Sequence, residues 1–338
     1  MSKRGRPKGS KNLSKKLLKE RKQECSIENE HSQIVNNSLV EKNNNQISQE
    51  RKDKLNTVLR EINKSGKAQI NYANTIEEKP RLSFGYKCLD KLTGGGIPCG
   101  SYTTIWGSKG VGKSTIAYKL IATTQKAGKV ACYVDMERSY DSNWAKIFDV
   151  DTENLIYVAT QTAEQTLDTV IKLCREKVVD LIVLDSLHGM SPKGEQYEGK
   201  ANKEKSIEDD TMALLARKLS QFFRMATPHV SDAKCAVLLI GQSRVDLGSF
   251  IKMETLSGGH ALMHNSRLIL RLRRGQGVDA PTEKVVTGKI NEKGKEIKET
   301  IKFGFDLVVH VDKSQIDGCT ELSEIHIPFY FKDGIRED

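Results

Sequence analysis

The sequence predicts an α/β fold, a doubly wound and mostly parallel sheet, for residues 79–338. A short β-rich run at 102–106 leads through a glycine-rich loop into an amphipathic segment at 115–122. Two further apolar runs, at 130–137 and 180–185, end in acidic residues. Such runs are typical of strands that are buried on both faces, and strands that alternate with helices favour a parallel sheet.

The loop after the first strand has the sequence GSKGVGKS and fits the pattern G-x-x-x-x-G-K-[ST] of a phosphate-binding loop. Its backbone N–H groups can wrap a β-phosphate, and the start of the next helix adds positive potential. A chance match in a glycine-rich turn is the alternative, and the flanking strand and helix argue against it. We therefore predict ATP and Mg²⁺ as ligands. The predicted contacts are Gly107, Ser108, Lys109, Gly110, Val111, Gly112, Lys113, Ser114 and Thr115.

Individual side chains of this predicted site have separate roles. Lys113 should reach the β- and γ-phosphates, and Ser114 should be a ligand of Mg²⁺. Asp185 ends the apolar run at 180–185 and should hold the same ion. Glu137 ends the run at 130–137 and should orient the attacking water. The alternative is that Asp135 and Glu137 merely cap the next helix; beside a phosphate-binding loop we favour the catalytic role.

Charge is distributed unevenly along the 338 residues. The net charge is +10, of which the first 22 residues carry +9. The remainder is nearly neutral, so the basic character belongs to an N-terminal arm and not to the body. Seven scattered cysteines indicate reduced thiols, and the sequence has neither a signal peptide nor an apolar run of membrane-spanning length. These features predict a cytoplasmic protein without a membrane partner.

The segments outside the strand-and-helix pattern have distinct compositions. Residues 1–50 are polar and basic and are predicted to be disordered. Residues 51–62 carry apolar side chains at helical spacing, and residues 67–72 resemble a lone strand. The sequence at 275–301 predicts an exposed hairpin insert around an Asn-Glu-Lys-Gly turn.

Several ordered motifs resemble the RecA family of recombinases, especially its phage-encoded members. They are LTGGGIPCG at 92–100, the phosphate-binding loop, YVDME at 133–137, LIVLDS at 181–186, IGQSR at 240–244 and SGGHA at 257–261. The stretch SQFFRMATP at 220–228 looks more like the phage branch. The resemblance implies a RecA-type ATPase core and an ATP-dependent DNA recombinase. Such a protein forms helical filaments on single-stranded DNA and promotes pairing and strand exchange with duplex DNA in recombination and repair. Single-strand-binding and mediator proteins would be candidate partners, and a phage-encoded chain would act in the host cytoplasm.

The resemblance assigns further residues to the nucleotide. Glu137 would be the catalytic carboxylate, and Asp141 and Trp144 fall where the family contacts and stacks on adenine. Gln242 matches the residue that senses the γ-phosphate and couples it to a DNA-binding loop. Without the resemblance, Trp144 would be a packed helix aromatic and Gln242 a polar cap at a strand end.

The resemblance also assigns DNA-binding and assembly elements. Residues 193–210 and 244–260 would be two DNA-binding loops, the second with Arg244, Gly258 and Gly259. Arg217, Ser220 and Arg224 lie at helical spacing on one face, where the family contacts phosphates; a solvated helix face is the alternative. The segments 51–62 and 67–72 would pack on a neighbouring subunit.

Two departures from the family pattern matter. The family commonly places two lysines across the subunit interface from ATP; here the first is Lys313, and Gln315 stands at the second position. Loss of a cation puts the hydrolysis rate in doubt but not nucleotide binding. The C-terminal lobe that bacterial members use to gather duplex DNA is expected to be absent.

The basic arm contains Arg4-Gly5-Arg6-Pro7 within residues 3–11, which resembles an AT-hook. Arg4 and Arg6 suit the narrow, negative minor groove of A·T tracts. A generic basic tail or a targeting signal is the alternative.

Two other functions use the same core. A non-catalytic accessory protein would use ATP only as a switch, and the intact Glu137 argues against it. A hexameric helicase would need a substantial folded N-terminal domain, which residues 1–50 cannot supply.

Overall fold

The computed structural model describes residues 48–66, 70, 72–73, 79–193, 197–198, 203–204, 214–245, 254–256, 260–275, 281–290 and 296–336. The chain divides into two compact units, Met1–Glu77 and Glu78–Asp338. Residues 1–47 of the predicted polar tail, which include Arg4 and Arg6, lie outside the described residues.

In the first unit, α2 (Gln49–Lys64) is the helix predicted at 51–62. Pairs four residues apart support it, among them Lys54 Nζ with Glu50 Oε1 at 2.6 Å. None of its residues is buried, and its stripe of Leu55, Val58, Leu59 and Ile62 is exposed or half-buried within the unit.

The strand predicted at 67–72 is not seen at its described positions. Ile70 and Tyr72 lie outside any strand. The Asn63 side chain donates to the Ile70 carbonyl at 2.9 Å and accepts from the Ile70 N–H at 2.8 Å. An amide side chain therefore satisfies the backbone groups of Ile70 that a neighbouring strand would have paired.

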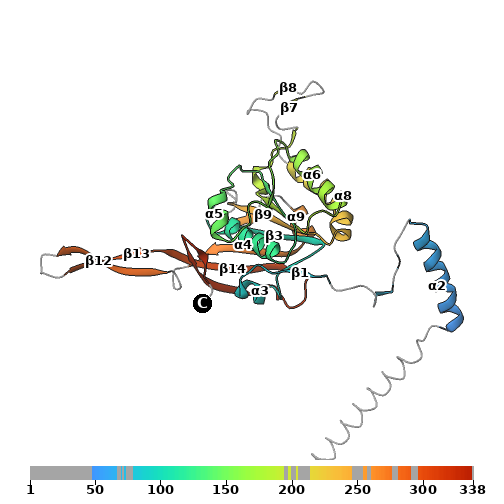
Figure 1. The fold of residues 1–338 in the computed structure, drawn as a ribbon, viewed down its shortest axis with the longest axis horizontal. Helices are drawn as coiled ribbons and strands as arrows, with labels where there is room; N and C mark the ends of the chain where they lie inside the picture. Colours follow the sequence, from blue (N-terminus) through green and yellow to red (C-terminus); the bar gives the residue numbers. More distant parts are fainter. Residues whose placement is uncertain are drawn as a thin grey trace, which may run out of the picture. The chain divides into compact units, whose positions relative to one another are not determined.

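The second unit is built on a ten-stranded sheet (Figure 1). Six strands are parallel: β5 (Ile156–Val158), β4 (Ala131–Asp135), β6 (Leu181–Asp185), β9 (Ala236–Val245), β3 (Ser101–Gly107) and β11 (Ser266–Arg274), in that spatial order. Beyond β11 the sheet continues antiparallel with β14 (Gly304–Ser314), β15 (Glu324–Tyr330) and β16 (Gly334–Ile335). The short β10 (Glu254–Leu256) pairs with the far end of β9. The predicted α/β fold with a mostly parallel sheet is confirmed.

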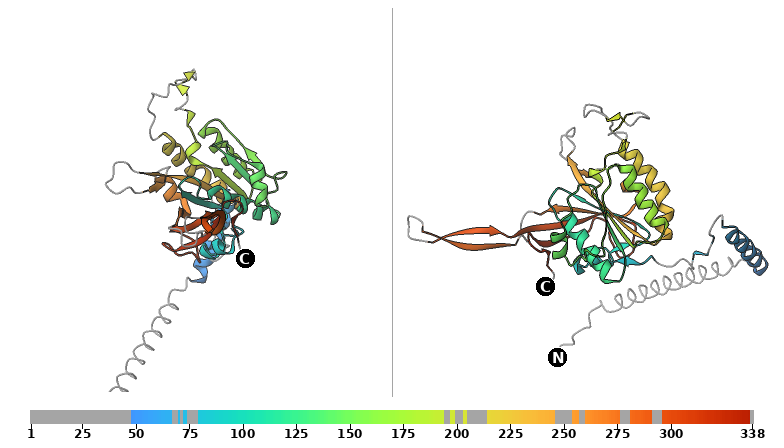
Figure 2. Two further views of the ribbon diagram at one scale, coloured as in Figure 1. Left: turned by 90° about the vertical axis from the view of Figure 1, so that its left-hand side faces the viewer. Right: turned by 45° about the horizontal axis from the view of Figure 1, so that its top comes forward.

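Helices cover both faces of the parallel strands, which explains why β3, β4 and β6 are buried along their whole length. On one face, α4 (Lys113–Lys126) shares a core with β6 residue Val183, together with α3 (Lys87–Leu92) and α5 (Ser142–Ile147). On the other, α6 (Ala163–Arg175) and α8 (Leu214–Asp232) pack side by side over Ile182 and Leu184 (Figures 1 and 2). Neighbouring residues of β6 therefore serve opposite cores, as a pleated strand requires.

The remaining described elements are short or peripheral. They are β1 (Arg81–Leu82) with β2 (Ile97–Pro98), the 3₁₀ turn η2 (Leu187–Gly189), β7 (Tyr197–Glu198) with β8 (Lys203–Glu204), and α9 (His260–Asn265). The insert predicted at 275–301 contains the antiparallel pair β12 (Thr282–Ile290) and β13 (Glu296–Lys302), which lies off the main sheet (Figure 1).

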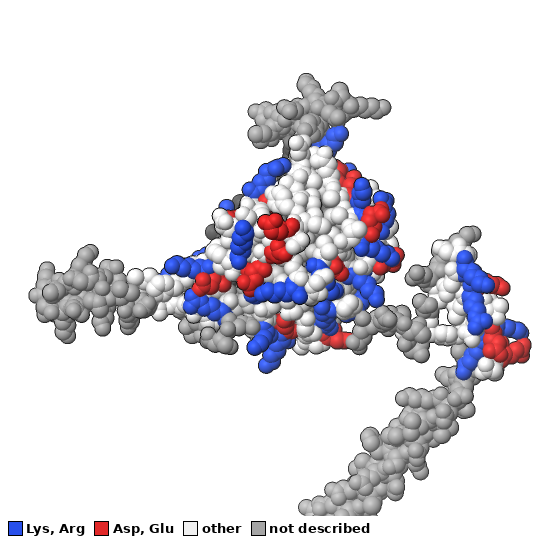
Figure 3. Space-filling view, in the orientation of Figure 1, with Lys and Arg blue, Asp and Glu red and all other residues white. Residues whose placement is uncertain are grey.

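Charged side chains of both signs are interspersed over the visible face of the second unit (Figure 3). This agrees with the near-neutral charge of the sequence after residue 22. Within the described part of the chain, no helix is both long and apolar enough to cross a membrane.

Candidate nucleotide-binding site

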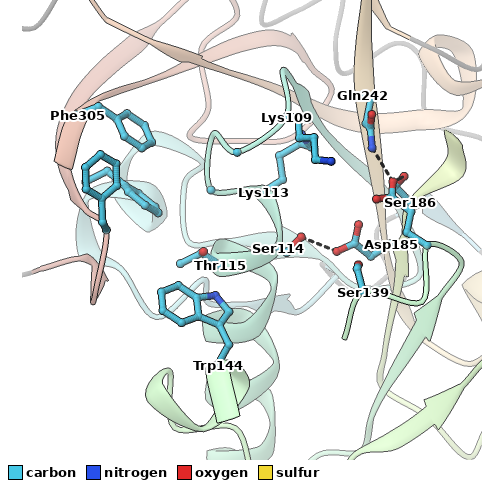
Figure 4. Close-up of a pocket in the computed structure, with 15 residues that line it drawn as sticks. Lys109, Lys113, Ser114, Thr115, Ser139, Trp144, Asp185, Ser186, Gln242 and Phe305 are labelled. Atoms are coloured by element: carbon cyan, nitrogen blue, oxygen red, sulfur yellow. Dashed lines mark hydrogen bonds between the residues drawn. The ribbon is translucent and has the colours of Figure 1, made fainter. Parts of the chain in front are cut away.

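A cavity of about 420 Å³ lies at the carboxyl ends of the parallel strands. One side is polar and contains the phosphate-binding loop, and the other is aromatic (Figure 4). The lining residues are Lys109, Gly110, Gly112, Lys113, Ser114, Thr115, Glu137, Ser139, Trp144, Asp185, Ser186, Gln242, Phe305, Phe329 and Phe331. Clefts outside the carboxyl ends of strands are the usual ligand sites of such sheets.

The loop joins the end of β3 to the start of α4. Gly112 immediately precedes the helix with φ at +93°, and Gly110 has φ at +72°. A Cβ atom on Gly112 would lie 2.5 Å from Cε2 of Phe329. Glycine is therefore required at residue 112 by both the backbone conformation and the approach of an aromatic ring. Val111 points away from the cavity into the buried core.

Lys113 is buried and hydrogen-bonded within its own loop. Its Nζ donates to the carbonyls of Gly107 at 2.9 Å and Ser108 at 2.7 Å. Burial lowers the pKa of Lys113, and the nearby carboxylates of Asp185 and Glu137 partly oppose this effect. The ammonium is thus placed in the loop where a phosphate group would replace the carbonyls as its acceptor.

Asp185, at the end of β6, receives two hydrogen bonds on one oxygen. Ser114 Oγ donates to its Oδ2 at 2.6 Å, and the hydroxyl of the buried Tyr133 donates to the same atom at 2.7 Å. Burial raises the pKa of Asp185, while these two bonds act in the opposite direction. The serine hydroxyl and the carboxylate are oxygen ligands of the kind that Mg²⁺ prefers, and they sit beside the loop that would hold the phosphates of a nucleotide. The residues present therefore fit Mg²⁺.

Glu137 is held by two neighbours at the same end of the sheet. The side-chain amide of Gln242, on β9, donates to Glu137 Oε1 at 2.6 Å, and the Ser186 hydroxyl bonds the same oxygen. Asp135 instead accepts from the backbone N–H groups of Ser139 and Tyr140. Asp135, the last residue of β4, thus fixes the turn that follows the strand, whereas Glu137 lines the cavity.

The aromatic side combines Trp144 with three phenylalanines. Phe305 and Phe329 stack with ring centroids 4.8 Å apart, and Arg274 lies 4.5 Å over Phe305 while donating to the Gly110 carbonyl at 3.1 Å. Trp144 lines the cavity, whereas the Asp141 carboxylate caps α5 by accepting from two backbone N–H groups and is not among the lining residues.

Sequence reasoning missed the three phenylalanines, Ser139 and Ser186. Phe329 and Phe331 are two residues apart, so their period-2 spacing on a strand was a usable signal.

Lys313 and Gln315 lie away from this cavity in the same chain. Lys313 of β14 lies opposite Ile269 of β11, and Ile269 lies opposite Thr104 in the middle of β3. The phosphate-binding loop, by contrast, follows the carboxyl end of β3. Its Nζ donates to the carbonyls of Met263 at 2.7 Å and His264 at 3.2 Å at the end of α9, and burial lowers its pKa. Gln315 is exposed just past the end of β14.

The predicted DNA contacts are partly described. Arg217 and Arg224 are exposed on α8, while the Ser220 hydroxyl bonds the carbonyl of Ala216 within the helix. Arg244 is the penultimate residue of β9, and nothing is described of its side chain. Gly258 and Gly259 lie outside the described residues, as do Arg4 and Arg6.

Comparisons with known proteins agree with this arrangement. Residues 53–309 match the family described as the RecA N-terminal domain. The chain is 31% identical over 283 residues to Protein RecA of Trichodesmium erythraeum, an alignment that covers 82% of this chain and 77% of the relative. It is 34% identical over 272 residues to Protein RecA of Geobacter sulfurreducens, which covers 76% and 78% of the two chains. A core built on a parallel sheet, a phosphate-binding loop at the end of β3 and these alignments lead to one conclusion: the chain belongs to the RecA family.

Proposed function

We propose that the chain is an ATP-dependent DNA recombinase that assembles into filaments on single-stranded DNA and promotes strand exchange with homologous duplex. The observation that carries the proposal is the 2.6 Å hydrogen bond from Gln242 to Glu137. β9 continues past Gln242 to Val245 and pairs there with β10. The bond thus links the cavity to the segment at 244–260, which the family resemblance assigns to DNA.

The proposed hydrolysis uses the polar side of the cavity. Bound ATP would supply the γ-phosphate bond that is cleaved. Lys113 would exchange its two carbonyl acceptors for phosphate oxygens, and Ser114 with Asp185 would hold Mg²⁺. Glu137 would accept a hydrogen bond from water and direct its oxygen toward the phosphorus. Trp144 and the stacked phenylalanines offer flat apolar surface for the base.

Assembly is supported by two separate features. The apolar stripe of α2 has Leu55 37% and Val58 48% exposed, and none of the described residues of its unit buries it, so a neighbouring subunit is the proposed partner. β14 carries Phe305 at one end and Lys313 eight residues farther on, which at about 3.4 Å per residue places them about 27 Å apart. We infer that Lys313 and Gln315 serve the ATP of an adjacent subunit, not that of their own.

Two finer points belong to the same proposal. The stretch at 220–228, which ends at Pro228 inside α8, supports a place among the phage-encoded members. Arg4 and Arg6 would bind the minor groove of A·T-rich duplex DNA. Deleting residues 1–12 should then weaken duplex binding and spare the ATPase activity that single-stranded DNA stimulates.

Glu137→Gln tests the proposal. The amide keeps the shape but cannot act as a base, so we expect filaments in electron micrographs with ATP and single-stranded DNA but a turnover about 10²–10⁴-fold below wild type. Glu153→Gln, at an exposed position outside the cavity lining, is the matched control and should hydrolyse ATP normally. Rings would favour a helicase. Turnover equal to wild type in Glu137→Gln would remove the catalytic assignment and favour an accessory protein that uses ATP as a switch.

A further inference from the structure

A second cavity of about 430 Å³ lies next to the nucleotide site. It is lined by Lys302, Phe303, Tyr330, Phe331, Lys332 and Arg336. Lys302 and Tyr330 end β13 and β15, Phe303, Phe331 and Lys332 lie just past these ends, and Arg336 follows β16. Among the described residues, the lining therefore consists of three aromatic rings and three cations, and no residue assigned to phosphate, Mg²⁺ or the predicted DNA loops belongs to it.

Two of the aromatic rings are exposed although their backbones are firmly held. Phe303 is 42% and Phe331 50% exposed, whereas Phe305 and Phe329 are buried. The Phe331 N–H donates to the Phe303 carbonyl at 2.8 Å, and the Phe303 N–H donates to the Pro281 carbonyl at 2.9 Å. The two backbones are thus paired, and both rings line the same cavity and are open to solvent, an arrangement that favours a ligand with flat apolar faces.

The cations of this cavity favour an anionic ligand. The Arg336 guanidinium lies 4.0 Å over the Tyr330 ring and also pairs with Asp333. Within the described residues, Lys302 and Lys332 form no ion pair, and both are exposed. The net charge of the lining is therefore positive, and two of its cations are available to phosphates.

From this combination we propose that the second cavity is a contact site for single-stranded DNA, in which bases stack on Phe303 and Phe331 and phosphates lie near Lys302 and Lys332. Rings that accept bases, with cations that follow the backbone, are the common design of single-strand binding surfaces. A free nucleotide is usually held by a loop of backbone amides, as at residues 107–114. The described lining of the second cavity consists of side-chain cations and aromatic rings instead, which favours single-stranded DNA over a free nucleotide.

The site would also contact the wall of the nucleotide pocket. Phe331 lines both cavities. Its ring lies 6.1 Å from that of Phe305, which in turn stacks on Phe329 at 4.8 Å. A base that moves Phe331 would therefore press on the aromatic side of the nucleotide site. The inference goes beyond the proposed function, because this surface lies outside α8 and the two predicted DNA loops.

Photocrosslinking of the full chain to an oligonucleotide that contains 5-iododeoxyuridine tests the placement. This base joins covalently to aromatic side chains on which it stacks. We expect crosslinked peptides that contain Phe303 or Phe331, identified by mass spectrometry. Crosslinks confined to other segments would overturn the proposal.

Exchange of the Phe303 ring tests the chemistry. Phe303→Leu keeps apolar bulk but loses the stacking face, so affinity for a single-stranded oligonucleotide should fall about five-fold or more. Phe303→Trp should keep wild-type affinity. Ile301→Ala, 43% exposed and outside the cavity lining, is the control and should also bind normally. Unchanged affinity in Phe303→Leu, or an equal loss in the Leu and Trp variants, would contradict a stacking role.

A titration with AMP separates a strand from a free nucleotide. If Phe303→Leu weakens AMP binding and leaves oligonucleotide binding unchanged, the cavity is a mononucleotide site and the proposal fails. If Phe303→Leu protein associates less than wild type in the absence of DNA, the rings instead bind a second copy, and it fails too. Wild-type protein that binds no oligonucleotide at all would refute the proposed recombinase, whereas oligonucleotide binding that is insensitive to Phe303→Leu would refute only this inference.

Discussion

The polar groups of the nucleotide site and the stacked phenylalanines opposite them come from different halves of one sheet. Lys113, Asp185 and Gln242 come from the ends of parallel strands or the loops just after them. Phe305 and Phe329 come from the antiparallel strands β14 and β15. Each of these polar groups is already held by a neighbour through a hydrogen bond of 2.6 to 2.9 Å, whereas the phenylalanines contribute stacked surface.

This difference indicates that the two halves would bind different parts of the nucleotide. A group that is already bonded can exchange its partner for a ligand atom without first losing its position, so the polar half is suited to charge and metal. The aromatic half offers area without directional bonds and is suited to a base. Variants in each half should therefore fail in different ways.

Lys113→Ala should give the largest effect, because it removes the only buried ammonium among the lining residues. Charge-assisted hydrogen bonds to two phosphates are worth about 3 kcal/mol together, so ATP affinity should fall about 100-fold. Titration with a fluorescent ATP analogue measures it. Lys119→Ala, at a surface ion pair of the same helix, should bind normally. A loss of only a few-fold would mean that the polar half does not dominate phosphate binding.

Gly112→Ala tests the junction between the halves. The residue has φ at +93°, and its new Cβ would lie 2.5 Å from the Phe329 ring, so we expect unfolding to become easier by about 1–3 kcal/mol and ATP affinity to fall. Gly110→Ala is the matched control, since it has a comparable φ of +72° but its nearest neighbour is Arg274 Nη2 at 3.7 Å.

The comparison of these two variants separates ring contact from backbone strain. If Gly110→Ala is as damaging as Gly112→Ala, strain alone explains the loss, and the halves are not coupled through Phe329. If adding Phe329→Leu to Gly112→Ala restores part of the stability, the contact between the halves is established. Thermal melts and the same nucleotide titration give both answers.

The polar half was predictable from the sequence because its chemistry follows local patterns. A strand, a glycine loop and a helix specify Lys113 and Ser114, and an apolar run that ends in an acid specifies Asp185. Phe305 was not predictable, because only the pairing of β14 with β11 and β15 brings it to residues almost two hundred positions earlier. The strand predicted at 67–72 stays a prediction: Ile70 and Tyr72 are not in a strand within this chain, and the side chain of Asn63 bonds the backbone of Ile70.

Tyr133→Phe should give a smaller effect within the polar half. It removes one of the two hydrogen bonds to Asp185 Oδ2 and leaves the ring in the core. Loss of a hydrogen bond worth about 1 kcal/mol should raise the Mg²⁺ concentration needed for half-maximal binding of an ATP analogue roughly five-fold. Tyr140→Phe, in the same aromatic cluster, is the control. An unchanged Mg²⁺ requirement would show that Ser114 alone positions the carboxylate.

Gln315→Lys should give the smallest change, on the antiparallel half. A cation at this position could stabilise charge on the γ-phosphate of the adjacent subunit, so DNA-stimulated ATP hydrolysis should rise a few-fold. Gln315→Met has similar length and no charge and should not raise the rate. No rise with lysine would indicate that another cation already fills this place.

The length of β14 affects how many complete ATP sites a filament contains. Suppose that one end of β14 contacts the nucleotide of its own subunit and the other end contacts the nucleotide of the adjacent subunit. A filament then always has one complete ATP site fewer than it has subunits. An isolated subunit then has none, and a pair has one. The rate of ATP hydrolysis per subunit should therefore rise with the length of the filament and then level off. Short and long filaments of the same protein should differ in this rate.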